Sequence, residues 1–239
     1  MPKKENVRQM FDSIAPEYDR LNHLMSMNVD KGWRRKALRR IVDSAGPLEV
    51  LDLACGTGDF SLAIARRMEK KGIAGHVSGV DLSEGMLAVM KEKIVAAGLS
   101  ERISTALGDG ENLPFADGSF DRVTIAFGIR NFEHREVGLR EMLRVLRPGG
   151  RLVLLELSVP ENRIVRWLYN LYFLHILPLI GGKVSGDRAA YNYLPASVVK
   201  FPGRTAFLQT LGECGFRSVT HKAFTLGICR MYTGEKPVL

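Results

Sequence analysis

From residue 48 onward, short apolar runs alternate with amphipathic segments of helix length. The runs are LEVLDLA (48–54), HVSGVDL (76–82), RISTALG (102–108), DRVTIAF (121–127) and RLVLLEL (151–157). Between them we expect helices over about 59–71, 83–97 and 135–147. The last of these should end at RPGG (147–150), where proline and glycine turn the chain into the next strand. This alternation predicts βα units on a mostly parallel sheet.

The two ends of the chain depart from the alternation. FRSVTHKAF (216–224) and GICRMYTGE (227–235) are separated by too few residues for a crossover helix, so these strands should pair antiparallel. The predicted fold is therefore α/β and Rossmann-like, with a seven-stranded sheet that an antiparallel hairpin closes. Residues before 48 read as helical with no strand to feed, and we expect a lid over the carboxyl ends of the strands.

We expect the 239 residues to form one domain, because 46% of them are hydrophobic and supply a packed core. Four parts follow from the pattern. They are a helical lid (1–46), a cofactor-binding core (47–158), a helical insertion facing substrate or membrane (159–203), and a final helix with the hairpin (204–239).

Charge and cysteine content limit the possible partners, metal sites and cellular location of the protein. The net charge of +8 favours anionic partners, such as nucleic acid, phospholipid head groups or a small anion. Cys55, Cys214 and Cys229 include no CxxC pair, so neither a disulfide framework nor a zinc site is expected, and the histidines show no metal-ligand spacing. No metal is predicted. The amino terminus has no apolar run of signal-peptide length, which predicts a cytoplasmic protein.

A glycine loop and a following acid suggest a nucleoside site. The strand VLDLA runs into Gly56, Thr57 and Gly58, and glycines there let the backbone approach a ligand closely. The next strand ends at Asp81, whose carboxylate can accept two hydrogen bonds from a ribose diol. Loop and acid together predict cofactor-binding residues.

The identity of the nucleoside follows from a missing glycine. Ser61 stands where a dinucleotide fold has its third glycine, which disfavours a pyrophosphate. S-adenosylmethionine carries ribose and adenine without phosphate. LDLACGTGD and LGDGENLPF resemble the first and the next motif of the class I methyltransferases that bind it, and in the second motif Asp109, with Gly110 beside it, would meet adenine. Taken singly, Asp81 could be an ordinary strand-end acid and Asp109 a turn former.

The acceptor should meet the residues that follow VTIAF. Enzymes that methylate exocyclic amines of bases often carry an Asn/Asp-Pro-Pro-aromatic loop at that point. This chain has Gly128, Ile129, Arg130 and Asn131 instead, which disfavours amine methylation.

Longer stretches resemble one family. MFDSIAPEYDRLNHLMS, GENLPFADGSFDRVTIAFGIRNFEH, LRVLRPGGRLVLLELSVP and YNYLPASV are similar to the ubiquinone/menaquinone biosynthesis C-methyltransferases, over about residues 7–235. The resemblance implies methyl transfer from S-adenosylmethionine to a ring carbon of a prenylated quinol. That quinol would be demethylmenaquinol or, as the alternative, the methoxy-benzoquinol of ubiquinone synthesis. The chain departs from this family at two positions. Relatives can have a serine that contacts the cofactor where this chain has Ala126, and some have glycine where this chain has Cys55.

The chemistry of carbon methylation gives the loop after the fourth run a role. A ring carbon attacks the methyl group only if the quinol hydroxyl loses its proton. Arg130 would stabilise the resulting phenolate and Asn131 would orient an oxygen, while Tyr18 and Asp19 of the lid would complete a path for the proton. The alternative is that Arg130 only pairs with Asp19 or Glu133 in a surface salt bridge.

Two segments point towards a membrane surface. IVRWLYNLYFLHILPLI (164–180) is strongly apolar but too interrupted to span a bilayer, so it is either a buried core helix or a helix that serves the prenyl tail at the membrane. KGWRRKALRR (31–40) would attract anionic head groups of the inner plasma-membrane leaflet, and equally RNA. A nucleic-acid-binding protein on a methyltransferase fold is therefore the alternative of another class. A homo-oligomer is compatible with the sequence.

Overall fold

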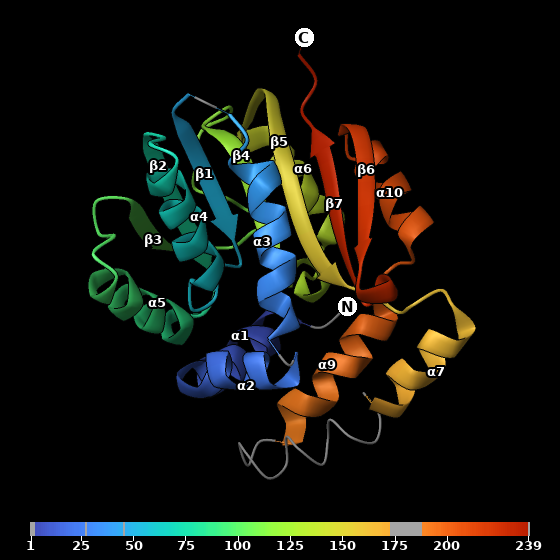
Figure 1. The fold of residues 1–239 in the computed structure, drawn as a ribbon. Helices are drawn as coiled ribbons and strands as arrows, with labels where there is room; N and C mark the ends of the chain where they lie inside the picture. The colour runs from blue at the N-terminus through green and yellow to red at the C-terminus, as the bar shows by residue number, and fades with distance from the viewer. Residues whose placement is uncertain (1–2, 27, 45, 173–187, 239) are drawn as a thin grey trace.

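The computed structural model describes residues 3–26, 28–44, 46–172 and 188–238. Within them the chain forms a seven-stranded sheet in the order β3-β2-β1-β4-β5-β7-β6 (Figure 1). The first five strands pair parallel, and β7 pairs antiparallel with both β5 and β6. The strands are β1 (Leu48–Leu53), β2 (Gly75–Asp81), β3 (Ile103–Leu107), β4 (Phe120–Ala126), β5 (Leu146–Leu157), β6 (Arg217–Phe224) and β7 (Cys229–Glu235). The predicted mostly parallel sheet with an antiparallel terminal hairpin is confirmed.

Helices cover both faces of the sheet. Alternate residues of β1 enter different cores: Leu48 and Val50 pack on one face, Leu51 and Leu53 on the other. Because neighbouring residues of a strand point to opposite faces, a sheet covered on both sides needs such a continuous apolar run. The helices of the first face are α3 (Val29–Ile41), α4 (Asp59–Lys70) and α5 (Glu84–Ala96), and those of the second are α6 (Arg135–Val145) and α10 (Arg204–Glu213).

The remaining helices gather at the carboxyl ends of the parallel strands, below the arrowheads of β1 and β5 in Figure 1. They are α1 (Lys4–Ile14), α2 (Tyr18–Met25), α7 (Arg163–Leu171) and α9 (Arg188–Lys200). The neighbours β1 and β4 connect to helices on opposite faces of the sheet, which is where ligands of such folds bind. Among the described residues, no helix has the length and apolar character needed to cross a membrane.

The prediction that residues 1–46 form a lid is wrong for α3. This helix runs along the sheet, and Trp33, Ala37 and Ile41 are buried in the core of the first face. Their spacing of four residues places them on one side of the helix, so burial of that apolar stripe decides where it packs. Of the amino-terminal helices, α1 and α2 lie at the carboxyl ends of the strands.

The prediction that RPGG ends a helix and forms a turn before the next strand is also wrong. Helix α6 ends at Val145, and β5 begins directly at Leu146. The register of β5 against β4 shifts between the pairs Phe120↔Leu146 and Arg122↔Arg151, so 147–150 form an irregular part of the strand. Gly149, with φ of +76°, takes a left-handed conformation there that glycine adopts without strain.

Part of the predicted insertion is outside the described chain. The range 159–203 contains residues 173–187, which the structure does not describe, and the second half of the apolar segment 164–180 falls among them. The described parts of the insertion are α7 and α9.

Candidate active site

A cleft lies at the carboxyl ends of β1, β2 and β3, beneath α1. We call it the donor cleft. The space inside it, open mouth included, is about 750 Å³. Of the predicted cofactor-binding residues, four line it: Gly56, Asp81, Asp109 and Gly110.

The glycine loop after β1 divides into two kinds of residue. Gly56, with φ of +56°, lines the donor cleft, and its backbone N–H donates to Asp81 Oδ2 at 2.8 Å. Gly58, with φ of +83°, does not line the cleft, and a Cβ there would collide with Met90 of α5. Thr57 is buried and lines a small polar pocket beside the loop instead. Gly58 is therefore required by packing.

Asp81 has the placement of a ribose-binding acid. In addition to the Gly56 N–H, its carboxylate accepts a hydrogen bond from the backbone N–H of Ser83 at 2.9 Å. Burial raises the pKa of Asp81, and these backbone donors oppose that shift. The two bonds fix the carboxylate at the edge of the cleft, and further donors would stabilise its charged form.

Asp109 and Gly110 follow β3 on the other side of the cleft. Asp109 accepts a hydrogen bond from the N–H of Glu111 at 2.9 Å and forms an ion pair with Lys4 of α1. At Gly110 a Cβ would lie 2.5 Å from the ring of Phe132, which itself lines the cleft. The absence of a side chain at Gly110 therefore lets an aromatic ring form part of the cleft wall.

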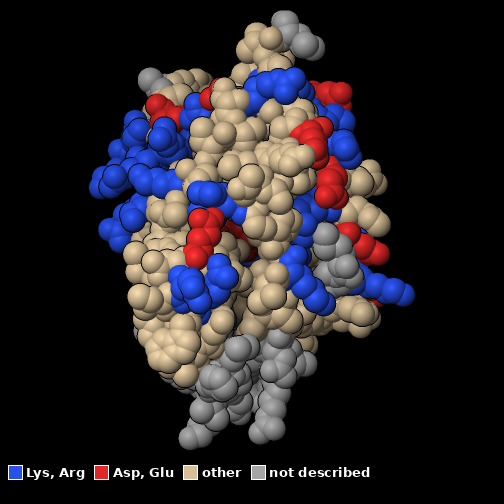
Figure 2. All heavy atoms as spheres, turned by 90° about the vertical axis from the view of Figure 1, so that its right-hand side faces the viewer, with Lys and Arg blue, Asp and Glu red and all other residues tan. Residues whose placement is uncertain are grey.

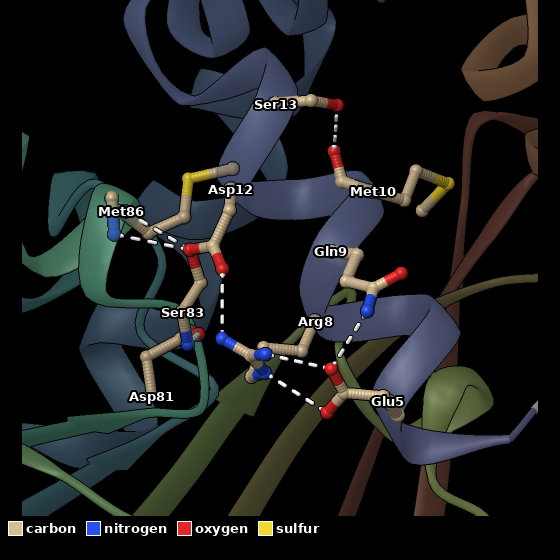
Figure 3. Close-up of polar contacts among 10 residues, drawn as sticks. Glu5, Arg8, Gln9, Met10, Asp12, Ser13, Asp81, Ser83 and Met86 are labelled. Atoms are coloured by element: carbon tan, nitrogen blue, oxygen red, sulfur yellow. Dashed lines mark hydrogen bonds and ion pairs between the residues drawn. The ribbon is translucent and has the colours of Figure 1, made fainter.

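Helix α1 covers the donor cleft, and its contact residues were not predicted from the sequence. Figure 3 shows Asp12 facing the start of α5. Its Oδ1 accepts hydrogen bonds from Ser83 Oγ at 2.6 Å and from the N–H of Gly85 at 3.1 Å. At the other end of α1, the backbone N–H of Lys4 donates to Glu133 at 3.0 Å. An amphipathic pattern reveals such a helix but not the groups that anchor it.

The donor set of the cleft fits S-adenosylmethionine. Asp81 offers a carboxylate for a ribose diol, and Asp109 offers one for an amine. The wall between them is apolar, with Leu53, Val80 and Met86 among its members. Carboxylates in the cleft would repel a phosphate but attract a cation. S-adenosylmethionine, a nucleoside with a cationic sulfonium and no phosphate, therefore matches this cleft.

A second and larger cavity adjoins the donor cleft, and we call it the acceptor cavity. It encloses about 1380 Å³, mouth included. Phe127 and Tyr18 line both spaces, so they separate the two. Phe127 has φ of +63°, a left-handed conformation that is rare for a bulky residue. The other walls of the acceptor cavity are mostly apolar or aromatic, and they include Trp33, Leu157, Leu168, Tyr169, Tyr172 and Ile228.

Arg130 lies in the wall of the acceptor cavity and is only 8% exposed. The expected alternative pairing with Asp19 or Glu133 is wrong. Instead, Nη1 forms an ion pair with Glu156 at 2.8 Å. Burial lowers the pKa of Arg130, but the charges of Glu156 and Tyr18 raise it, and the net pKa is above the ordinary arginine value. The guanidinium therefore stays protonated.

The structure places the other predicted catalytic residues, Tyr18, Asp19 and Asn131, in three different positions. Tyr18 is at their junction, and burial raises its pKa. Asp19 accepts a hydrogen bond from Thr57 and pairs with Lys93 at 2.8 Å, which places it beside the glycine loop. Asn131 lines the donor cleft, and its Oδ1 accepts a hydrogen bond from Tyr193. Only Tyr18 shares the acceptor cavity with Arg130.

Two partners of Arg130 were not predicted. Glu156 is inside the apolar run RLVLLEL, and Ser197 is on α9, 67 positions away in sequence. For Glu156, the available signal was a lone glutamate among the apolar residues 152–157. For metals, no group of three His, Cys, Asp or Glu side chains with suitable placement occurs within 3–26, 28–44, 46–172 and 188–238.

Comparison with known proteins identifies the chain. The family model described as the ubiE/COQ5 methyltransferase family matches residues 1–236. The ubiquinone/menaquinone biosynthesis C-methyltransferase UbiE of Geobacter sulfurreducens is 48% identical over 234 residues, which are 98% of this chain and 90% of that protein. The demethylmenaquinone methyltransferase of Bacteroides fragilis is 42% identical over 234 residues, covering 98% and 94%.

Comparison with a solved structure shows that the fold alone does not determine the reaction. The crystal structure of the cyclase SpnF is 20% identical, with a TM-score of 0.73 over 100% of this chain and 98% of that one. A protein named a cyclase shares the architecture, so the fold does not decide the reaction. The sequence match does: the chain belongs to the ubiE/COQ5 methyltransferase family, and its methyl donor is S-adenosylmethionine.

Proposed function

We propose that the protein methylates a ring carbon of demethylmenaquinol and so produces menaquinol. The observation that carries the proposal is the acceptor cavity, which is wide, mostly apolar and separated from the donor cleft only by Phe127 and Tyr18. A prenylated ring fits such walls, and one edge of it would face the donor. The name of the Bacteroides fragilis relative supports this substrate.

The side chains around the two spaces have separate tasks. When bound in the donor cleft, S-adenosylmethionine supplies an electrophilic methyl group. Asp81 accepts the ribose hydroxyls, and Asp109 accepts the adenine amine. Arg130 faces the acceptor and lowers the pKa of the quinol hydroxyl, which pushes electron density into the ring.

We assign the proton path to Tyr18. Its half-buried side chain lies at the junction of the donor cleft and the acceptor cavity, and the charge of Arg130 acts on it. The phenol beside a guanidinium can accept the proton of the quinol hydroxyl while it donates its own proton to bulk water at the mouth of the acceptor cavity. Asp19 and Asn131 act from the donor side, where Asp19 orders the glycine loop through Thr57.

The prenylated benzoquinol of ubiquinone synthesis is the alternative acceptor. It needs the same chemistry, and the Geobacter sulfurreducens relative is named for both quinones. The test is incubation of the purified protein with S-adenosylmethionine and each reduced quinol, followed by mass spectrometry of the ring. A kcat/KM for the naphthoquinol at least tenfold higher than that for the benzoquinol supports the proposal. A higher kcat/KM for the benzoquinol would mean that the benzoquinol is the substrate.

We further propose that the protein is cytoplasmic and docks on the inner face of the plasma membrane through α7. Ile164, Trp167, Leu168 and Leu171 recur at helical spacing and form one stripe, and Ile164 is 72% exposed. The expected alternative of a buried core helix is therefore wrong for 163–171. In those residues only Tyr169 is buried, and it faces the acceptor cavity.

The charge distribution is compatible with this orientation. Figure 2 shows the side of the molecule that carries α7 and α10, where lysines and arginines lie over the upper part, at mid-height and on both sides, while the described atoms below them are mostly uncharged. An exposed apolar stripe with a tryptophan is typical of helices that lie in the interface of a bilayer. Because Leu168 belongs to the stripe and also lines the acceptor cavity, a prenyl tail could pass directly between membrane and site.

A further inference from the structure

Glu156 is a charged residue inside the sheet. Its side chain is 0% exposed, and it lines neither the donor cleft nor the acceptor cavity. Oε1 accepts hydrogen bonds from Arg130 Nη1 and from the N–H of Leu157, each at 2.8 Å. Oε2 accepts the backbone N–H of Arg130 at 3.1 Å. The carboxylate thus holds the side chain and the backbone of the same arginine.

The guanidinium of Arg130 is held on two further sides. Nη1 also donates to the carbonyl oxygen of Phe127, and Nε donates to Ser197 Oγ of α9 at 3.3 Å. Ser197 Oγ in turn donates to the carbonyl oxygen of Leu194 at 2.8 Å, which fixes its own orientation. Among the described residues, Nη2 has no partner, and Arg130 lines the acceptor cavity. The remaining donors of the guanidinium are therefore left to the acceptor.

The contacts with Glu156, Phe127 and Ser197 keep the guanidinium of Arg130 in one orientation. Without a fixed partner, a buried arginine would turn towards any available carbonyl oxygen. The carboxylate of Glu156 compensates the charge of the guanidinium and leaves a fixed dipole, whose positive end faces the cavity. Preorganised dipoles stabilise a developing anion without reorganisation during the reaction. A free cation of the same charge would have to be reoriented in each turnover.

We propose that Glu156 is a positioning residue, which aims Nη2 of Arg130 at the acceptor oxygen. The inference rests on the proposed function, since it assigns Arg130 to the quinol. Glu156 is not the general base, because both of its oxygens are occupied by N–H donors and neither borders the cavity. Ser197 contributes to the same positioning from α9 and so connects the insertion to the chemistry.

Two substitutions at Glu156 test the charge and the length of the side chain separately. Glu156→Gln keeps the shape and loses the charge, and Glu156→Asp keeps the charge but withdraws it by one methylene. We expect kcat to fall about a hundredfold in Glu156→Gln, as for loss of one preorganised donor. The KM for quinol and the affinity for S-adenosylmethionine should stay within about threefold, and the ascending limb of the pH–rate profile should move to higher pH.

Glu141 provides the matched control. It accepts a backbone N–H from Leu113 at 2.9 Å and pairs with Arg144 at 2.7 Å, as Glu156 does with Leu157 and Arg130, but it lines neither space. Glu141→Gln should leave kcat and its pH dependence unchanged. A loss of kcat in Glu141→Gln as large as that in Glu156→Gln would mean that general destabilisation causes both, and would overturn the proposal.

Coupling to Arg130 separates positioning from a merely structural role. Because Glu156 acts through Arg130, Glu156→Gln combined with Arg130→Lys should be no slower than the slower single variant by more than about threefold. Fully multiplicative losses would show that the two residues act independently and would reject the proposal. Ser197→Ala, which removes the acceptor of Nε, should lower kcat about tenfold and show the same lack of additivity.

A measurement without substrate keeps the inference distinct from the proposed function. In ¹⁵N NMR spectra, the Arg130 guanidinium should give separate Nη resonances in the parent, since its rotation is hindered. They should merge in Glu156→Gln, while the resonances of Arg144 stay unchanged. Merged Arg130 resonances in the parent would overturn the positioning role. If instead the parent methylates neither quinol but its resonances are separate, the proposed function fails and the positioning of Arg130 stands.

Discussion

The carboxylate of Asp12 accepts a 2.6 Å hydrogen bond from Ser83 Oγ, and so ties α1 to the start of α5. Ser83 is also the N-cap of α5, because its Oγ accepts the N–H of Met86 at 3.1 Å. One hydroxyl thus caps a helix of the core and anchors the helix that covers the donor cleft (Figure 3). The cover cannot lift without breaking this bond.

Asp12→Ala should therefore loosen the cover more than it destabilises the fold. Hydrogen bonds to a charged acceptor contribute roughly 1.5–3 kcal/mol, so we expect S-adenosylmethionine to dissociate about tenfold faster or more. Stopped-flow measurement of cofactor release provides the test. Ser13→Ala is the control, because its hydroxyl donates only to the carbonyl of Met10 on the exposed side of α1. Equal release rates for the parent and Asp12→Ala would show that α1 does not retain the cofactor.

Asp81→Ala should weaken the binding of S-adenosylmethionine by at least about 1–3 kcal/mol, the usual cost of a lost buried polar contact. The carboxylate is fixed by the N–H groups of Gly56 and Ser83, so its removal also frees the loop after β1. Isothermal titration calorimetry with S-adenosylmethionine measures the affinity. An affinity equal to that of the parent would mean that the ribose is held elsewhere.

Asp52 predicts a pH dependence of stability. It is buried in β1 and accepts a hydrogen bond from Ser61 Oγ at 2.5 Å, and burial raises its pKa from 3.8 to about 7. The folded state then binds the proton more tightly than the unfolded state. The protonated carboxyl of Asp52 therefore contributes fully to the free energy of unfolding below about pH 4. This contribution declines as the pH rises towards 7 and is absent at higher pH.

Asp52→Asn removes this titration and keeps an acceptor for Ser61. One pKa unit corresponds to about 1.4 kcal/mol, so the substitution should stabilise the protein by about 2 kcal/mol more at about pH 8.5 than at about pH 5.5. Denaturant unfolding at both pH values measures the difference between the variant and the parent. A difference that does not change with pH would show that Asp52 is ionised in the folded state at both pH values.

The sheet could be predicted from sequence because its signals are local. The apolar runs and the short hairpin connection each lie within a few residues, and they place all seven strands to within a few positions. The position of α3 was not predictable in the same way. It was placed in the lid because the helical residues before 48 have no strand to feed, whereas burial of Trp33, Ala37 and Ile41, spaced by four, decides that it packs on the sheet.

The candidate site shows the same limit. Residues at strand ends, such as Asp81 and Arg130, could be selected because strand ends of a parallel sheet meet at one edge. Their partners could not, because Glu156 is 26 positions from Arg130 and Asp12 is 71 positions from Ser83. Asp19 and its neighbour Tyr18 both line the small polar pocket beside the glycine loop, but of the two only Tyr18 also lines the acceptor cavity.

Trp167 should report on membrane docking by its fluorescence. The chain has two tryptophans, and Trp33 is buried and donates a hydrogen bond to Thr225, whereas Trp167 is 64% exposed. Vesicles with anionic lipids should therefore shift the emission of Trp167 to shorter wavelength. Trp167→Ala with Leu171→Ala should weaken vesicle binding and raise the KM for long-tailed quinols, but not for a short-tailed analogue. An equal rise for both quinols would contradict a role in serving the tail.

Arg130→Lys tests the role of the planar guanidinium. A lysine keeps the charge, but a single ammonium cannot meet Glu156, the Phe127 carbonyl oxygen and an acceptor oxygen in the fixed directions that a guanidinium offers. Turnover should fall about a hundredfold or more, as for loss of a preorganised donor. Affinity for S-adenosylmethionine should hardly change, because Arg130 lines the acceptor cavity and not the donor cleft.

The pH–rate profile decides whether Arg130 acts on the quinol. If the guanidinium stabilises the phenolate, the lysine enzyme has a less stable anion, the apparent pKa of the bound quinol rises, and the ascending limb moves to higher pH. Arg144→Lys is the control, since Arg144 also binds a carboxylate in two places, at Glu141, but lies outside both spaces. A profile of Arg130→Lys that superimposes on that of the parent would mean that Arg130 does not set the protonation of the acceptor. Loss of cofactor affinity in step with turnover would instead assign it to the donor side, because a residue that meets only the acceptor affects catalysis without affecting the binding of the methyl donor.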